Sequence, residues 1–174
     1  FILNDRPSEP PPLKNRLTLA FTDAINETGD ENLNSISGQF ITSLEQSRII
    51  SVLTMEQMVD AQRRFGVKEP EKVDEKSCRK ISRDAKIDFL AKPTIRKFGN
   101  IYTIEVTVFD PISNELSTSP GRKNLNFSGI PDAIDDLCLE IRRWLKENDD
   151  EIQENKDKLA DISTDNMFAF EHFS

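Results

Sequence analysis

The stretch formed by residues 87–116 limits the fold more than any other part of the chain, because it contains strand-like runs joined by tight turns. The first turn is predicted at residues 98–100, which read Phe-Gly-Asn, and a second one begins at Asp110. Between them, hydrophobic and polar residues alternate with the period of two that is typical of a strand with one buried face. Strands joined by tight turns are antiparallel neighbours, so this stretch predicts a β-meander. The residues expected on its buried face are Tyr102, Ile104, Val106 and Val108.

The region before the meander alternates between strand and helix patterns. Residues 17–21 alternate in hydrophobicity and predict a first strand, whereas apolar residues recur at helical spacing over residues 33–47. Residues 49–53 form a short, almost wholly apolar run that is typical of a buried parallel strand. The polar residues 26–32 predict a loop. Strand, helix and strand in this order require parallel pairing through a right-handed crossover.

Helix-capping signals indicate two more helices before the meander. Thr54 and Gln57 fit a capping box, and Gly66 fits the C-terminal cap of the same helix. After a charged connection, a third short helix leads into the strand that begins near Asp88. The inward-facing residues expected are Met58, Ala61 and Phe65 in the first of these helices, and Cys78, Ile81 and Ala85 in the second.

A last helix follows the meander. Pro131 lies in its first turn, and Arg142, Arg143 and Lys146 lie toward its negative end, where positive charges are favourable. An apolar stripe along this helix is long enough to cover one face of a sheet. The stripe consists of Ile134, Leu137, Cys138, Ile141 and Leu145, with Trp144 expected at the rim of the core.

Taken in order, these elements predict an α/β fold, β-α-β-α-α-β-β-β-α, with helices packed on a mixed five-stranded sheet. We expect the spatial order second, first, third, fourth, fifth strand. The last strand, over residues 116–127, is weak and belongs at an edge, because Pro120 and Gly121 interrupt it. Pro93 is a difficulty, since it falls in a strand that this order makes central, unless it occupies a bulge or the free end of the strand.

The composition divides the 174 residues into three segments. Residues 1–12 are a proline-rich linker, residues 13–147 the α/β domain, and residues 148–174 a charged linker with the start of a C-terminal helix.

The net charge of −8 disfavours nucleic acids and anionic membrane surfaces as partners. No run approaches the roughly 20 apolar residues that span a bilayer, so no direct membrane insertion is expected. The chain starts with Phe-Ile-Leu, which is either the end of an upstream apolar segment or an arbitrary boundary.

Three motifs in the meander resemble the amino-terminal domain of the TolB family, in which a helix leads into a hairpin and a second turn. The motifs are Ile87-Asp88-Phe89-Leu90, Lys97-Phe98-Gly99-Asn100 and residues 110–116, which read Asp-Pro-Ile-Ser-Asn-Glu-Leu. Residues 17–21 resemble the first strand of the family, although Ala20 replaces its usual proline and Lys86 replaces a helix-capping glycine. The resemblance covers residues 17–147 and implies the same α/β fold.

The resemblance also implies a cellular setting. Such domains occur in the extracytoplasmic parts of bacterial envelope proteins, and downstream of a membrane helix in receptor-type kinases, adenylate cyclases and transcription regulators. Residues 162–173 resemble the junction where such domains pass into tetratricopeptide repeats. The implied location is the extracytoplasmic or periplasmic side of a bacterial membrane, with the cytoplasm as the alternative. The resemblance brings no catalytic residues onto this sequence.

The chain lacks the local motifs that are typical of catalysis or cofactor binding. His172 is the sole histidine, and it has neither a cysteine nor a second histidine nearby for a zinc site or a catalytic triad. The six glycines are scattered, without a phosphate-binding loop. Asp149, Asp150 and Glu151 lack the ligand spacing of a calcium loop and are expected to be a solvated run. We therefore expect no catalytic residues, no cofactor and no metal.

The two cysteines, Cys78 and Cys138, each lie on the apolar face of an expected helix. Neither belongs to a CxxC motif, so metal or redox chemistry is disfavoured. Buried free thiols are the favoured interpretation, because such thiols behave as small hydrophobic groups, and a disulfide between them is the alternative.

A hydrophobic cluster near the end of the chain has no evident partner within the domain. An exposed aromatic patch indicates an interface, whereas a terminal helix that folds back on the domain would bury the same residues. The cluster consists of Met167, Phe168, Phe170 and Phe173.

These observations favour a non-catalytic sensing or protein-interaction domain of a bacterial signalling or cell-envelope protein, as part of a larger membrane-anchored chain. Its partner would be a protein or an unknown small ligand, and a homodimer fits the hydrophobic cluster. One alternative is a dimerisation or spacer module. The other is an enzyme whose site is assembled from distant residues near strand ends, such as Asp23, Asp88 and Asp110.

Overall fold

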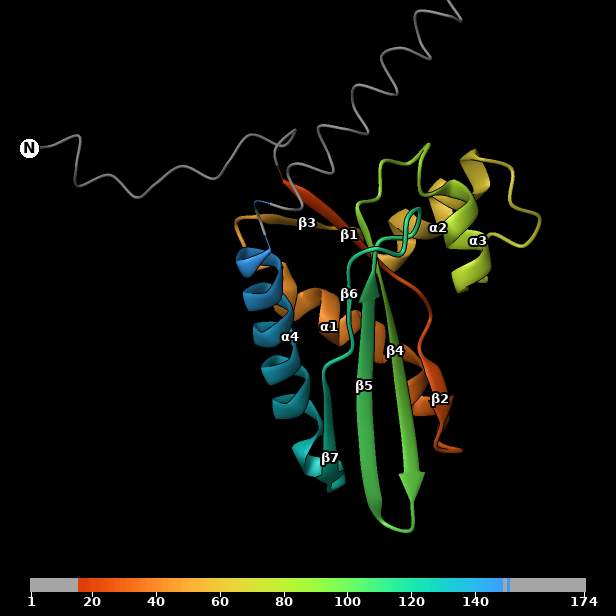
Figure 1. Ribbon diagram of the computed structural model, residues 1–174. Helices are drawn as coiled ribbons and strands as arrows, with labels where there is room; N and C mark the ends of the chain where they lie inside the picture. Colours follow the sequence, from red (N-terminus) through yellow and green to blue (C-terminus); the bar gives the residue numbers. More distant parts are fainter. Residues whose placement is uncertain (1–15, 149, 151–174) are drawn as a thin grey trace, which may run out of the picture.

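The computed structural model describes residues 16–148 and residue 150, which form a mixed α/β fold (Figure 1). The proline-rich linker, the segment from residue 151 onward and the four residues of the hydrophobic cluster lie outside the described residues. The strands are β1 (Leu17–Phe21), β2 (Ile25–Glu27), β3 (Ile50–Val52), β4 (Phe89–Phe98), β5 (Ile101–Phe109), β6 (Ser117–Thr118) and β7 (Gly121–Leu125). The α-helices are α1 (Ile36–Leu44), α2 (Met55–Arg64), α3 (Glu75–Ile81) and α4 (Ile130–Glu147).

The sheet has the strand order that the sequence predicts. Its path is β3-β1-β4-β5-β6, with β1 parallel to both β3 and β4, and β5 antiparallel to β4. The expectation of a mixed sheet is therefore confirmed. The last strand of the prediction is split by Pro120 into β6 and β7, and both pair with β5 at the edge.

One strand was not expected. β2 lies partly within the predicted loop of residues 26–32 and pairs in parallel with Thr94–Arg96 of β4. The reason is length, because β4 has 10 residues and β1 has 5, so β4 extends past the end of β1 and leaves its backbone groups unpaired there. β2 occupies this free stretch, and the sheet has seven strands instead of five.

The same arrangement explains how Pro93 fits into a central strand. Pro93 pairs with Val106 of β5, and the Val106 N–H donates away from β4 to the Pro120 carbonyl. Residues in such a pair both direct their backbone groups outward, so the Pro93 nitrogen faces the other neighbour of β4. There it lies opposite the interval between β1 and β2, where the ladder is interrupted. No ladder hydrogen bond is lost by having proline at this position.

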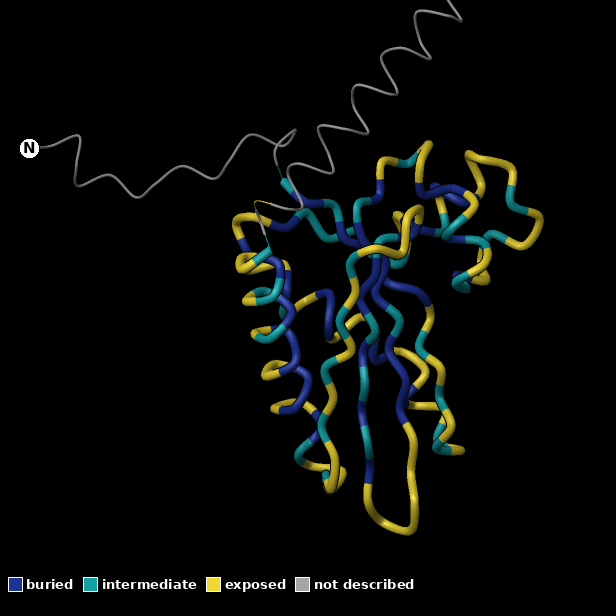
Figure 2. Tube along the Cα trace, in the orientation of Figure 1, coloured by how far each residue is buried: buried dark blue, intermediate teal, exposed yellow. Residues whose placement is uncertain are grey.

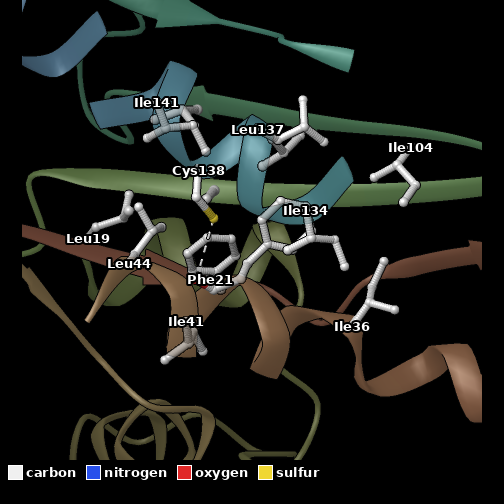
Figure 3. Close-up of a cluster of buried hydrophobic side chains, with 14 of the residues drawn as sticks. Leu19, Phe21, Ile36, Ile41, Leu44, Ile104, Ile134, Leu137, Cys138 and Ile141 are labelled. Carbon is white, nitrogen blue, oxygen red and sulfur yellow. Dashed lines mark hydrogen bonds between the residues drawn. The ribbon is translucent and has the colours of Figure 1, made fainter. Parts of the chain in front are cut away.

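Helices α1 and α4 cover one face of the sheet and form the main core (Figure 3). The predicted stripe of α4 is buried, and the rings of Phe21 and Phe40 stack with their centroids 5.6 Å apart. Trp144 is partly buried and meets the ring of Phe89 edge-on at 5.6 Å, which confirms its place at the rim. The buried residues of this core come from all central strands, so α1 and α4 cover the sheet along most of its length.

Helices α2 and α3 form a second, smaller core on the opposite face. Their Met58, Ala61, Cys78 and Ile81 pack against Ala20, Leu90 and Phe109 at one end of the sheet. The predicted capping box is present, since the Thr54 side chain accepts from the Gln57 N–H and the Gln57 side chain accepts from the Thr54 N–H. Gly66 has the positive φ of +81° that its predicted role in the helix C-terminus requires.

Three expectations about the ends of elements are wrong. Phe65 is 38% exposed, because α2 ends at Arg64 and the phenylalanine ring instead packs under the Arg64 guanidinium. Ala85 follows the end of α3 at Ile81 and is only partly buried. The apolar run of residues 49–53 pairs in parallel with β1 as expected but is only partly buried, since Ile50 is buried whereas Ile49 is exposed.

The disulfide alternative is also wrong. Cys78 belongs to the core under α2 and α3, whereas Cys138 belongs to the core under α1 and α4, so the sheet lies between them. Both thiols are free and buried, and burial raises the pKa of Cys78 to about 12 and that of Cys138 to about 11. The Cys138 thiol donates to the Phe40 carbonyl at 3.6 Å, so it serves packing between α1 and α4.

Candidate protein-interaction surface

The β4–β5 hairpin projects beyond the helices, and Figure 2 shows its tip as a continuous exposed segment. Nine cross-strand pairs hold the two strands in register up to the pair between Phe98 and Ile101. The chain reverses through a two-residue turn in which Gly99 has a φ of +60°, a conformation that favours glycine. The Phe-Gly-Asn turn signal therefore gives a long, regular hairpin whose last pair on either side of the turn is hydrophobic.

Alternation along the strands places a second set of residues on the face opposite α1 and α4. Ile95 and Ile104 point to the main core, so their neighbours Thr94 and Glu105 point the other way. Helices α2 and α3 cover only one end of that face, and the remainder is uncovered. We call this remainder the open face; it comprises Ile25 and Glu27 of β2, Arg96 and Phe98 of β4, and Ile101, Thr103 and Glu105 of β5, around the buried Thr94.

The open face combines exposed hydrophobic side chains with charged ones. Phe98 is 91% exposed, Ile101 49% and Ile25 43%. Two of its charged residues pair within the surface, since Arg96 Nε lies 3.4 Å from Glu27 Oε2 across the β2–β4 ladder. Apolar residues with a polar, largely neutralised surround are the composition expected of a transient protein interface.

An ion-pair network borders the open face where α3 begins. Glu75 accepts from the Lys92 ammonium and from the Arg79 guanidinium, both at 2.8 Å. These hydrogen bonds, first that of Lys92 and then that of Arg79, hold the pKa of Glu75 below its ordinary value. Arg79 also donates to the Pro111 carbonyl at 3.1 Å and packs over the Phe109 ring. The network fixes α3 to the sheet, and it limits how far the smaller core extends over this face.

The three carboxylates considered as a dispersed catalytic site each accept a backbone N–H. Asp23 accepts from Val73 at 3.0 Å, Asp88 from Thr18 at 2.8 Å, and Asp110 from Ile112 at 2.9 Å. The pocket of about 390 Å³ that contains Asp23 is lined by neither Asp88 nor Asp110. The structure does not bring the three together, and the enzyme alternative loses the arrangement on which it was based.

Burial raises the pKa of the Asp23 carboxyl, while the hydrogen bond from the Val73 N–H acts in the opposite direction. Asp23 also donates its own backbone N–H to the Val73 carbonyl at 2.7 Å. Its contacts therefore tie the end of β1 to the segment before α3, which is a structural role.

Some residues that the sequence singles out lie outside the part of the chain that the structure describes. These are the hydrophobic cluster of Met167, Phe168, Phe170 and Phe173, and also His172. Within residues 16–148 and 150, no cluster of three or more histidine, cysteine, aspartate or glutamate side chains could hold a metal ion. Among the helices in that part of the chain, none is both long and apolar enough to cross a bilayer. The turn at residues 98–100 was predicted from the sequence, but the exposure of the Phe98 side chain was not. The available signal for that exposure was a phenylalanine directly before a turn glycine.

The fold is similar to solved structures of bacterial proteins. TolB from Acinetobacter baumannii gives a TM-score of 0.50 at 14% identity, and the match covers 75% of this chain and 28% of TolB. The LpoB C-terminal domain from Salmonella enterica gives 0.48 at 12% identity, covering 61% of this chain and 82% of that domain. A lipoprotein from Neisseria meningitidis gives 0.45 at 13% identity, covering 72% and 96%. No protein-family model and no curated protein matches the chain.

The similarity to TolB shows a shared fold, in agreement with the family resemblance of the meander motifs. This chain matches little more than a quarter of TolB, so the function of the whole TolB protein does not carry over. The resemblance to tetratricopeptide junctions and to receptor kinases or cyclases gains no support from these structures.

Proposed function

We propose that this chain is a non-catalytic protein-interaction domain of a bacterial cell-envelope protein, and that it binds a protein partner through the open face. The observation that carries the proposal is Phe98, which is 91% exposed at the tip of a regular hairpin. Burying a phenylalanine side chain is worth about 1.5–3 kcal/mol, so a rigid hairpin that presents one favours contact with another molecule.

The surroundings of Phe98 support the same proposal. Ile101 pairs with it across the turn, and Ile25 lies farther along the same face. Because β4 and β5 are held by a continuous ladder, little backbone entropy is lost when the face is covered, which favours affinity. Interfaces of this kind usually depend on a few aromatic anchors, and Phe98 has the position of such an anchor.

The envelope setting is supported by the TolB resemblance and by the shared fold. One of the similar structures is a lipoprotein. A role in signalling, the sensing of a small ligand, and membership of a larger membrane-anchored chain stay predictions from the sequence, as does the alternative of a dimerisation or spacer module.

Photo-crosslinking in the cells that produce this protein tests the proposal. A benzophenone amino acid replaces Phe98 in one variant and Phe65 in a matched control, because Phe65 is also exposed but lies after α2, away from the open face. We expect a discrete crosslinked protein from position 98 that is absent from position 65. Identical crosslinks from both positions, or none from either, would contradict the proposal.

A second measurement separates binding from folding. Phe98→Ala removes the anchor without opening the core, so we expect an unchanged Tm and a 10- to 100-fold, or about 1.4–2.8 kcal/mol, weaker affinity for the crosslinked partner. Titration of the purified partner against both variants measures this difference. Equal affinities would show that the contact lies elsewhere.

A further inference from the structure

A positively charged pocket lies between α4 and the residues that precede β3. In Figure 1, the C-terminal end of α4 and the start of β3 lie at the opposite end of the sheet from the hairpin tip. Its volume is about 590 Å³, and the described residues that line it include no acidic side chain. Three cations come from the last turns of α4, namely Arg142, Arg143 and Lys146, and Arg48 lies opposite them. In a chain with a net charge of −8, such a concentration of cations is a local exception.

The floor of this pocket is apolar. Ile49, directly before β3, is 37% exposed, and Leu139 of α4 is 44% exposed. Arginine and lysine side chains add their aliphatic stems to such a surface while keeping their charges in water. The pocket therefore suits a ligand that carries hydrophobic side chains between carboxylates.

The chain itself contains a segment of this chemistry. Residues 149–174, which directly follow α4, contain eight acidic residues and two lysines, and so account for −6 of the net charge of −8. Asp165 and Glu171 flank Phe168 and Phe170 there, and Phe173 follows Glu171 by two residues. The acidic segment follows the C-terminal end of α4, where the helix dipole is negative and repels carboxylates. Cationic side chains are therefore the favourable partners of these acidic residues.

We propose that the basic pocket is the docking site for residues 165–173 of the same chain. Charge complementarity supports this occupant, and so does connectivity, because Lys146 in the pocket wall is three residues before the start of the acidic segment at Asp149. Phe168 follows Asn148 by 20 residues, which reach at most about 70 Å, far more than the return to the pocket requires. A tethered segment also acts at an effective concentration in the millimolar range, which an acidic peptide of another molecule rarely reaches.

Paramagnetic relaxation in the full chain tests this docking. A nitroxide is attached to Ser174→Cys, and the buried, weakly acidic thiols of Cys78 and Cys138 leave the new cysteine as the reactive one. We expect the amide signals of Ile49 and Leu139 to broaden at low protein concentration. The broadening should persist when the labelled chain is diluted into unlabelled chain, which distinguishes docking within one molecule from docking between two.

A charge reversal and its control make the result specific. Arg142→Glu, Arg143→Glu and Lys146→Glu together should lower the docked-to-undocked ratio about tenfold, because the ion pairs with Asp165 and Glu171 are lost and like charges then face each other. The matched control reverses three exposed lysines on the opposite face of the sheet, Lys68, Lys76 and Lys80 in and before α3, and should leave the broadening unchanged. Raising the NaCl concentration in the unsubstituted chain should weaken docking without altering the fold. This measurement tests the proposal even if the charge-reversed chain fails to fold.

Three results would overturn the proposal. The first is the absence of broadening at the pocket in the full chain. The second is broadening that disappears when the nitroxide-labelled chain is diluted into chain without the nitroxide, which would make a second copy the occupant. The third is broadening that survives both the charge reversal of the pocket and high salt.

Discussion

The two faces of the sheet use the same strands for different purposes. On the face under α1 and α4, Ile104 is fully buried, whereas the adjacent Glu105 on the open face is partly exposed. The main core follows the sheet along most of its length, and the smaller core of α2 and α3 ends where Glu75 pairs with Lys92. Stability is therefore concentrated on one face, which leaves most of the other free to contact a partner.

The largest expected effect on stability comes from substituting a phenylalanine by alanine on each of the two faces. Phe40→Ala removes a fully buried ring that stacks on Phe21, and should lower the free energy of unfolding by about 3–5 kcal/mol. Phe98→Ala removes a ring that is 91% exposed and should change it by less than about 0.5 kcal/mol. Urea denaturation of both variants measures the contrast. A large loss of stability for Phe98→Ala would mean that the hairpin tip packs within the domain.

The covered face was largely predictable from the sequence. Tyr102, Ile104, Val106 and Val108 alternate with polar residues because one side of β5 is buried, and the stripe of α4 has the matching helical period. Local rules were sufficient here, since each element shows its own buried side in its own residues. The capping box at Thr54 and the left-handed Gly66 were predictable for the same reason.

The open face was not predictable in this way, because it depends on which strands outlast their neighbours. β2 has no distinctive pattern in its three residues, and it forms because β4 offers unpaired backbone beyond β1. Likewise, the exposure of Ile25 and Phe98 depends on how far α2 and α3 reach over the sheet. Such lengths are properties of the assembled fold, and no single segment of the sequence contains them.

A medium effect is expected at the border between covered and open parts. Glu75→Gln keeps the side-chain shape but removes the charge that pairs with Lys92 and Arg79, and should cost about 1 kcal/mol at neutral pH. Because the folded pKa of Glu75 lies below its ordinary value of 4.5, this contribution is complete above that value and is lost as the pH falls through the folded pKa. Denaturation measured at pH 7 and at successively lower pH should thus show a difference between the variants that is full at pH 7 and decreases as the pH falls.

The matched control is Glu71→Gln, which breaks a more exposed contact with Arg63 at 3.3 Å. We expect it to change stability by less than about 0.5 kcal/mol, because both side chains are mostly in water. If the two substitutions had equal effects, the network of Glu75 would not be what attaches α3 to the sheet.

The smallest effect, and the only stabilising one, is expected at Lys86, in the turn between α3 and β4. Its φ is +57°, where the family pattern has glycine, and its N–H donates to the Arg83 carbonyl. The left-handed conformation costs a residue with a Cβ about 1–2 kcal/mol, whereas glycine adds about 0.4–1 kcal/mol of unfolded-chain entropy. Lys86→Gly should therefore stabilise the fold by about 0.5 kcal/mol and raise the Tm by about 2 °C.

Asn124→Gly in β7 is the control for this last prediction, since Asn124 has a similar φ of +58°. Asparagine tolerates the left-handed region far better than lysine, so the relief of strain is smaller and the added entropy cancels it. Calorimetry should show no rise in Tm for Asn124→Gly. A lower Tm for Lys86→Gly would mean that the lysine side chain itself contributes to the junction between α3 and β4. The smaller core, and with it the covered part of this face, would then include the Lys86 side chain in addition to the buried residues under α2 and α3.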